Sequence, residues 1–337
     1  MTGDWKPDVL GTHFEQLTIP LEPDIEGEVV ATLVRYVPPP RLRLTHPAAG
    51  GADVLYVHGW SDYFFQTQLA EFWHRSGARF FALDLRKYGR SLRPHQTPGD
   101  IDDLGTYDEE IDAALAAMGQ EADASRHRRP LILMGHSTGG LTLSLWADRH
   151  RGRAAAVVLN SPWLEFQARG VGRAALAPLV GIGARIDPHA PMPNVDLGFY
   201  TRSVSATMDG EWDYNLDWRP VRGFAVHPRW LSAVLAGHAR VAAGLAIDAP
   251  VLTMLSARST ILPRWTPEMM RSDIVLVVDD IAGRALHLAP TVTVARLNGA
   301  LHDVMLSAPD VRADAYTELT RWLRGYLGPR RDQLSGS

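Results

Sequence analysis

Short runs of apolar residues alternate with longer amphipathic segments along most of the chain. This alternation is typical of βαβ units, in which buried parallel strands are joined by helices. We expect such strands at residues 54–57, 79–85, 131–134, 154–159, 251–255 and 292–297. Two segments before residue 40 alternate polar and apolar positions, which predicts an antiparallel hairpin. The pattern therefore predicts an α/β fold with a mostly parallel, doubly wound sheet.

Three of the intervening segments predict helices. Residues 102–118 have helical periodicity and begin with acidic side chains, which suit the N-terminus of a helix. Residues 141–146 form an apolar stretch that predicts a buried helix, and residues 310–327 predict a helix that closes the fold. Helices of this kind would cover the two faces of the sheet.

The interval 161–247 interrupts the alternation between two predicted core strands. It is rich in glycine, proline and arginine, and its aromatic residues include Trp163, Phe166, Phe199, Tyr200, Trp212, Tyr214, Trp218, Phe224 and Trp230. We expect residues 1–160 and 248–337 to form the core and 161–247 to form an inserted, largely helical cap. Ligands bind at the carboxyl edge of open α/β sheets, so Trp163 and Trp212 are expected to close an apolar pocket there.

Composition and charge exclude several classes of protein. The 337 residues carry 34 basic and 38 acidic side chains without a basic patch, so we expect no nucleic-acid partner. The absence of cysteine excludes disulfides, thiolate metal sites and a cysteine nucleophile. The longest apolar stretch, residues 174–184, is shorter than the roughly 20 residues that span a membrane. With no signal-peptide pattern at the N-terminus, we expect no transmembrane segment and a cytoplasmic location.

The strongest chemical signal is the segment Gly135-His136-Ser137-Thr138-Gly139. It matches the pattern G-x-S-x-G, and it lies between a predicted strand and a predicted helix, as that pattern requires. A serine on such a sharp turn projects its hydroxyl above the sheet, and the following helix N-terminus favours developing negative charge. Ser137 is therefore the candidate nucleophile.

A serine nucleophile needs a base, and the base needs a third group that orients it. On this fold the expected order along the chain is serine, then an acid, then histidine. Of the histidines after Ser137, only His302 follows the last predicted strand, where a loop points toward the nucleophile. We therefore expect His302 to be the base.

Together these segments resemble the α/β-hydrolase superfamily, in particular its branch of monoacylglycerol lipases, lysophospholipases and serine aminopeptidase-like proteins. The resemblance rests on His58-Gly59-Trp60, on residues 84–91 (DLRKYGRS), on the serine turn and on His302. It covers roughly residues 50–160 and 248–325. It implies an α/β-hydrolase fold in which the backbone amides of Trp60 and Thr138 form the oxyanion hole.

Two positions, Lys87 and His58, differ from the rest of the matching segments. Residues 84–91 follow the family pattern D-x-R-G-x-G-x-S except at Lys87, where the pattern has glycine. The family's His-Gly segment precedes the oxyanion-hole amide, and we expect His58 itself to be structural rather than catalytic.

The acid of the triad is the least obvious member. In the family it follows the strand at 251–255, but residues 257–260 contain no carboxylate. Asp273-Ile274-Val275-Leu276 resembles the family's D-x-V-V stretch, and Asp273 precedes His302 by 29 residues, which is comparable with the family's spacing. We therefore expect Asp273 to be the acid and residues 259–272 to be an insertion. The alternatives are Asp279, Asp280 and Glu165.

The resemblance implies a serine hydrolase that cleaves carboxylic esters through an acyl-enzyme. The expected substrates are small-molecule acyl esters of lipid-like or medium chain length, of the monoacylglycerol or lysophospholipid type. An amidase, peptidase or thioesterase using the same triad is an alternative, and so is a non-catalytic ligand-binding protein of this fold. The sequence does not determine the oligomeric state.

No cofactor or metal is expected. The chain has no H-E-x-x-H motif and no histidine–carboxylate cluster with metal-ligand spacing. Residues 170–175 match the dinucleotide pattern G-x-G-x-x-A, but no convincing strand precedes them, so we do not expect a cofactor there.

Overall fold

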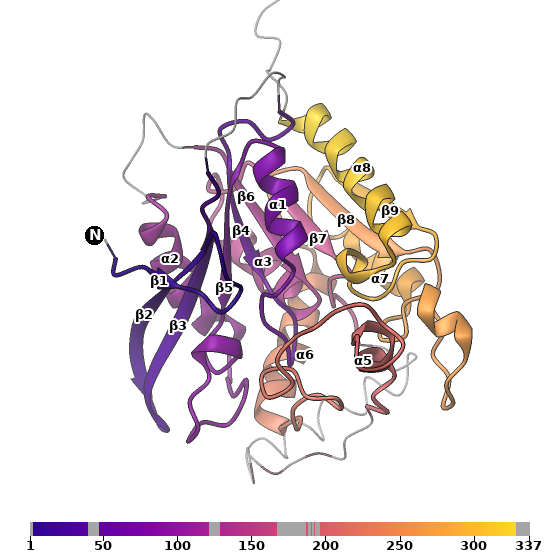
Figure 1. Ribbon diagram of the computed structural model, residues 1–337, viewed down its shortest axis with the longest axis horizontal. Coiled ribbons are helices and arrows are strands. Elements are labelled where there is room, and N and C mark those ends of the chain that lie inside the picture. The colour runs from indigo at the N-terminus through magenta and orange to yellow at the C-terminus, as the bar shows by residue number, and fades with distance from the viewer. Residues whose placement is uncertain are drawn as a thin grey trace, which may run out of the picture.

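The computed structural model describes residues 3–39, 47–120, 129–166, 187, 190, 192 and 196–327. Within them the chain forms one sheet of nine strands in the order β1-β2-β3-β5-β4-β6-β7-β8-β9 (Figure 1). The strands are β1 (Lys6–Pro7), β2 (Phe14–Asp24), β3 (Gly27–Tyr36), β4 (Asp53–Val57), β5 (Arg79–Asp84), β6 (Leu131–His136), β7 (Ala156–Asn160), β8 (Val251–Ser256) and β9 (Val292–Leu297).

The strands divide into an antiparallel and a parallel part. β2 and β3 form the hairpin that the alternating N-terminal pattern predicts, and β3 pairs antiparallel with β5. From β5 onward, each neighbouring pair of strands is parallel. The predicted α/β-hydrolase fold with a mostly parallel sheet is therefore confirmed.

Helices cover both faces of this sheet (Figure 1). The α-helices are α1 (Thr67–Arg75), α2 (Asp108–Ala117), α3 (Thr138–Arg149), α5 (Phe199–Val204), α6 (Pro228–Ala243), α7 (Val278–Ala285) and α8 (Pro309–Tyr326). Short 3-10 helices occur at η1 (Gly89–Ser91), η2 (Leu104–Tyr107), η3 (Pro267–Arg271) and η4 (Val304–Leu306). The predicted helix at 102–118 begins as the 3-10 turn η2, at whose N-terminus the Asp103 side chain accepts a hydrogen bond from the amide of Gly105.

The two faces of the sheet bury separate cores. Along β4, Val54 and Tyr56 pack in the cluster that contains α1 and α8. Leu55 and Val57 pack in the cluster that contains α2, α3, α6 and α7. Successive side chains of a strand point to opposite faces, so a continuous apolar run is the expected sequence of a strand with helices on both sides.

The insertion leaves the sheet after β7 and returns at β8. Its last part, α6, packs directly on α3, where a Cβ at Gly237 would lie 2.8 to 3.2 Å from three leucine side chains. This helix therefore belongs to the layer that covers the sheet. Residues 199–224 instead lie below the sheet in Figure 1, where their amides bond to loops of the core, as described below.

Of the helices among the described residues, none combines the length and apolar character needed to cross a membrane.

Candidate active site

Ser137 lies on a sharp turn between the end of β6 and the start of α3, with φ 51° and ψ −117°. A residue other than glycine pays a conformational cost in this region, and such strain is typical of functional sites. The turn is possible because its neighbours lack side chains. A Cβ at Gly135 would lie 2.6 Å from the Gly139 carbonyl oxygen, and a Cβ at Gly139 would lie 2.2 Å from that of His58. The G-x-S-x-G pattern is therefore a packing requirement of this turn.

His302 follows β9 and is oriented by Asp273. Its Nδ1 lies 2.9 Å from Oδ2 of Asp273, and both side chains are buried. The other carboxylate oxygen, Oδ1, accepts hydrogen bonds of 2.8 Å from the amides of Val275 and Leu276. Asp273 is thus held as an acceptor, which leaves Nε2 of His302 available on the far side of the ring.

The chain brings Asp273 to this place by an excursion after β8. Residues 259–272 leave the end of the strand and return to it, and Ser259 and Asp273 form a parallel bridge. The Thr260 amide donates to the Asp273 carbonyl at 2.8 Å, and the Asp273 amide donates to Arg258 at 3.0 Å. Asp273 therefore lies beside the strand end despite following it by 17 residues in the chain.

The alternative acids lie elsewhere. Asp279 and Asp280 are exposed in the first turn of α7. Glu165 forms an ion pair with Arg284. Among the described residues, the ring of His302 forms no hydrogen bond with any of these three carboxylates.

The amides of Trp60 and Thr138 flank Ser137, and no hydrogen bond to either of them occurs within the described part of the chain. Both amides are therefore free of hydrogen-bond partners among the described residues, and of the two residues only Trp60 lines the cavity described below. His58 supports the loop that carries Trp60: its Nδ1 lies 2.7 Å from the Gly59 carbonyl, and its Nε2 accepts from the Leu85 amide at 3.1 Å. Burial lowers the pKa of His58, in keeping with a neutral ring.

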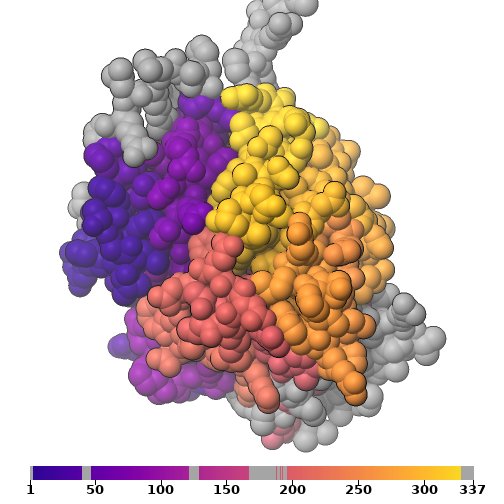
Figure 2. Space-filling model, turned by 45° about the vertical axis from the view of Figure 1, so that its right-hand side comes forward, coloured from indigo at the N-terminus to yellow at the C-terminus, as the bar shows by residue number. Residues whose placement is uncertain are grey.

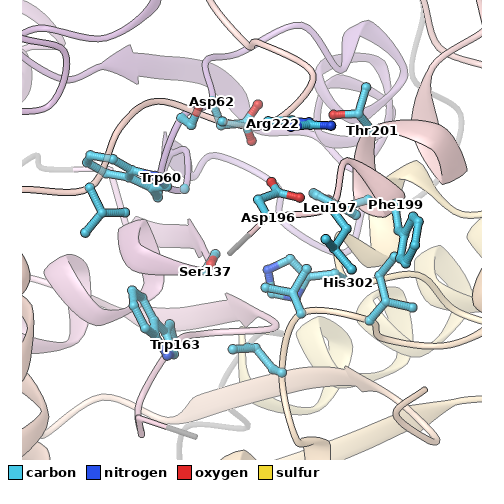
Figure 3. Close-up of a pocket in the computed structure, with 18 of the residues that line it drawn as sticks. Trp60, Asp62, Ser137, Trp163, Asp196, Leu197, Phe199, Thr201, Arg222 and His302 are labelled. Atoms are coloured by element: carbon cyan, nitrogen blue, oxygen red, sulfur yellow. The ribbon is translucent and has the colours of Figure 1, made fainter. Parts of the chain in front are cut away.

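Ser137 and His302 face one cavity of about 590 Å³ (Figure 3). Figure 3 shows the indole rings of Trp60 and Trp163 on one side of Ser137 and the ring of His302 on the other. The apolar side chains of the wall include Trp163, Phe166, Met192, Leu197, Phe199, Phe224, Val226, Trp230, Leu231, Ile261, Leu262, Met269, Ile274, Val275 and Leu276. In the described residues, the Ser137 hydroxyl and His302 are not hydrogen-bonded, and such contacts often tighten only when substrate binds.

Of the two tryptophans expected to close the pocket, Trp163 lines the cavity and Trp212 does not. The expectation for Trp212 is wrong because its indole N–H donates to the Leu306 carbonyl at 2.9 Å and its ring packs against Phe65. Trp212 therefore joins the insertion to the core, and a buried indole usually finds such a partner.

Four charged residues in the cavity wall, Asp62, Asp196, Arg219 and Arg222, were missed by the sequence analysis, and two of them form a pair. Asp62 follows Trp60 closely in the core, and Arg219 comes from the insertion; Nε of Arg219 lies 3.1 Å from Oδ1 of Asp62. Burial raises the pKa of Asp62 to about 6, although the Arg219 guanidinium opposes this shift. Nothing in the sequence indicates that these two residues meet, because 157 positions separate them.

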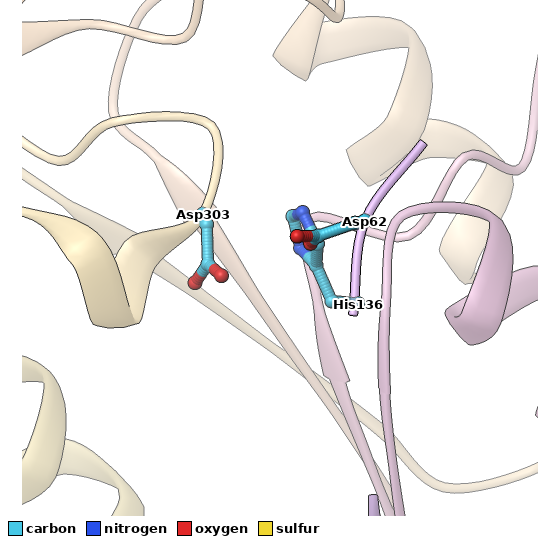
Figure 4. Close-up of side chains that lie close together, drawn as sticks. All are labelled: Asp62, His136 and Asp303. Carbon is cyan, nitrogen blue, oxygen red and sulfur yellow. The ribbon is translucent and has the colours of Figure 1, made fainter. Parts of the chain in front are cut away.

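Asp62 also belongs to a cluster of three side chains of metal-ligating type. Within the described residues, ligand atoms of Asp62, His136 and Asp303 lie within 4.8 Å of one another (Figure 4). Asp303 already accepts hydrogen bonds from Asn160 at 2.6 Å and from other donors, and Asp62 is paired with a guanidinium. These partners fit a hydrogen-bonded network better than a cation site. The dinucleotide-like segment 170–175 lies outside the described residues.

Comparison with known proteins agrees with the fold. A family model described as serine aminopeptidase, S33, matches residues 50–269. The chain belongs to this α/β-hydrolase family. Phospholipase YtpA of Bacillus subtilis (strain 168) is 31% identical to it over 120 residues, which are 35% of this chain and 43% of that protein. The match thus spans less than half of that relative.

Solved structures share the fold of this S33-family chain at low sequence identity. The monoacylglycerol lipase of Paleococcus ferrophilus is 19% identical, with a TM-score of 0.60 over 82% of this chain and 96% of that one. A soluble variant of monoglyceride lipase from Saccharomyces cerevisiae, in complex with a substrate analog, is 14% identical, with a TM-score of 0.61 over 91% and 94%. These similarities show that the chain shares the fold of both proteins.

The structure explains how this chain departs from the family pattern at Lys87. The residue has φ 61°, a conformation that favours glycine. Its buried Nζ lies 2.5 Å from Asp24 and 2.6 Å from Glu26. Ion pairs to the β2–β3 hairpin therefore stabilise a lysine where the pattern has glycine.

Proposed function

We propose that this S33-family chain is a serine hydrolase that cleaves carboxylic esters of lipid-like alcohols or acids through an acyl-enzyme. The observation that carries the proposal is that Ser137, on its strained turn, and the Asp273–His302 pair face the same largely apolar cavity. An apolar wall suits an acyl chain, because burial of apolar area contributes about 25 cal/mol per Å².

In the proposed reaction, Oγ of Ser137 attacks the ester carbonyl carbon while Nε2 of His302 takes the hydroxyl proton. The Asp273 carboxylate accepts from Nδ1–H, keeps the ring in the required tautomer and stabilises its cationic form. The amides of Trp60 and Thr138 bind the oxyanion, and one such donor contributes about 2.7–4 kcal/mol in a serine protease. The histidine then protonates the leaving alcohol, and water releases the acyl group by the same steps.

We further propose that the segment of the insertion at residues 196–227 acts as a cap over Ser137. Several hydrogen bonds join it to the core: the Phe224 amide donates to Ser61 Oγ at 3.0 Å and the Asn215 amide to Tyr63 Oη at 2.8 Å. Both acceptors lie in the loop that follows β4 and carries Trp60. In Figure 2 this segment of the insertion, in salmon, packs between the N-terminal half of the chain and the orange segment after β8.

Fluorophosphonate labelling of the purified protein tests the proposal. We expect the parent to be labelled and to hydrolyse p-nitrophenyl esters, and Ser137→Ala to lose both with an unchanged circular dichroism spectrum. Ser144→Ala, which removes a buried hydroxyl from the same helix, is the matched control and should keep both. Undiminished labelling of Ser137→Ala would overturn the assignment. A matched panel of esters, anilides and thioesters separates ester cleavage from amide or thioester cleavage.

A further inference from the structure

The excursion that returns Asp273 to the end of β8 also forms part of the cavity wall. Its members Thr260, Ile261, Leu262 and Met269 line the same cavity as Ser137. The segment therefore has two roles in the geometry: it carries the carboxylate that orients His302, and it borders the space in front of Ser137.

The excursion is held against the insertion as well as against the core. The ring of Trp265 makes an edge contact with Phe199 at 5.8 Å, and the guanidinium of Arg202 lies 4.3 Å from the same indole. Both partners belong to α5. At its core end, Ser259 Oγ donates to the Leu276 carbonyl at 2.7 Å and accepts from the Val278 amide at 2.9 Å. These contacts hold the excursion between α5 and the start of α7.

Burial changes along this wall. Met269 is 1% exposed, whereas Ile261 and Leu262 are 49% and 48% exposed although they line the cavity. Leu197, from the insertion, is 53% exposed and lines the cavity too. Single exposed apolar residues are ordinary on protein surfaces, but three large ones that border one cavity form an apolar rim. We call Leu197, Ile261 and Leu262 the rim.

We propose that the excursion 259–272 is the acyl-chain wall of the site and that the rim binds the distal methylenes of chains too long for the cavity. This inference rests on the proposed function and names its substrate class as long-chain acyl esters. The acyl chain is the occupant that fits, because the rim is apolar and continuous with the cavity that contains Ser137. Each methylene that leaves water there is expected to raise kcat/KM about fourfold.

The test is the acyl-chain profile of an Ile261→Ser/Leu262→Ser double variant of the full chain. We measure kcat/KM for p-nitrophenyl butyrate and p-nitrophenyl dodecanoate below their aggregation concentrations. The variant should lose about tenfold on the dodecanoate, which corresponds to roughly two methylenes, and stay within about twofold on the butyrate. Leu286→Ser is the matched control, since Leu286 is 63% exposed and does not line the cavity; both rates should be unchanged.

A second readout separates this inference from the proposed function. Binding of dansyl-undecanoic acid, followed by its fluorescence, should weaken about tenfold in the double variant and not in Leu286→Ser. An unchanged dodecanoate rate and unchanged probe binding, or equal losses on both esters, would overturn the role of the rim. A parent that hydrolyses no ester but shows the expected pattern of probe binding would instead overturn the proposed function and support the rim as a ligand-binding wall.

Discussion

Nδ1 of His302 lies 2.9 Å from Oδ2 of Asp273. Asp273 is the residue at which the chain returns to the end of β8 after the excursion 259–272. This contact selects one carboxylate from the four that the sequence leaves open. Because an amide in its place would favour the wrong histidine tautomer, Asp273→Asn should lower kcat by a factor approaching 10⁴ with an unchanged fold. Steady-state kinetics and circular dichroism together measure this.

Asp279→Asn and Asp280→Asn are the controls for this prediction, because both carboxylates are exposed in the first turn of α7. Each should retain kcat within about twofold of the parent. A loss in either that matches the loss in Asp273→Asn would contradict the orientation of His302 by Asp273.

Gly139→Ala should destabilise the protein and reduce the fraction that folds, because its Cβ would lie 2.2 Å from the His58 carbonyl oxygen. Backbone atoms cannot yield as a flexible side chain does, so we expect a loss of about 1–3 kcal/mol or more in the free energy of unfolding. Urea denaturation followed by tryptophan fluorescence measures it.

The matched change is Gly283→Ala in α7, where a new Cβ would meet no atom within 4 Å. Alanine loses less conformational entropy than glycine on folding into a helix, so this variant should be stabilised by about 0.5–1 kcal/mol. Equal destabilisation by the two changes would show that the close approach at Gly139 has no special cost.

Lys87→Met should destabilise the fold strongly. The buried Nζ is paired with Asp24 and Glu26, so its removal leaves these two carboxylates without that cation, whereas Asp100, 3.6 Å from Nζ, keeps its ion pair with Arg229. Loss of one partner from a buried ion pair typically costs about 3–5 kcal/mol in the free energy of unfolding. The measurement is the urea midpoint at constant ionic strength.

The chain has only one other lysine, which makes a natural control. Lys6 pairs with Asp4 at 3.4 Å in an exposed position, so Lys6→Met should change the free energy of unfolding by less than about 0.5 kcal/mol. If Lys87→Met were as mild as this, the ion pairs of Lys87 would contribute little to stability.

Asp62 predicts a specific pH dependence of stability. Its pKa rises on folding from 3.8 to about 6, chiefly by burial, so folding favours the protonated form. The contribution is fully present below about pH 4 and is lost as the pH rises through about 6. Two pKa units correspond to about 3 kcal/mol.

Asp62→Asn removes this titration. The free energy of unfolding of the parent relative to the variant should therefore fall by up to about 3 kcal/mol between pH 4 and pH 7. Urea titrations at several pH values measure the difference. The pKa of His58 is lowered by burial in both proteins, so its contribution to the pH dependence cancels in the comparison. A difference that does not vary with pH would contradict the shift.

Much of this protein is determined locally by its sequence. Apolar runs predict the parallel strands because each such strand is buried on both faces, and the glycines around Ser137 predict the turn because only they fit its backbone. Those requirements involve neighbouring residues, so they can be read from a short segment. Even the displaced Asp273 follows from a local resemblance together with its spacing from His302.

Contacts between distant segments were decided only by the tertiary structure. No local pattern relates Asp62 to Arg219, or Trp212 to the Leu306 carbonyl, because these partners come from separate segments of the chain. The sequence shows that the insertion is rich in aromatic residues. Burial of an aromatic side chain stabilises the fold whether the side chain lies in a cavity wall or between the insertion and the core. The position of each aromatic residue depends on how the insertion lies across the sheet. The same placement determines the shape of the cavity around Ser137.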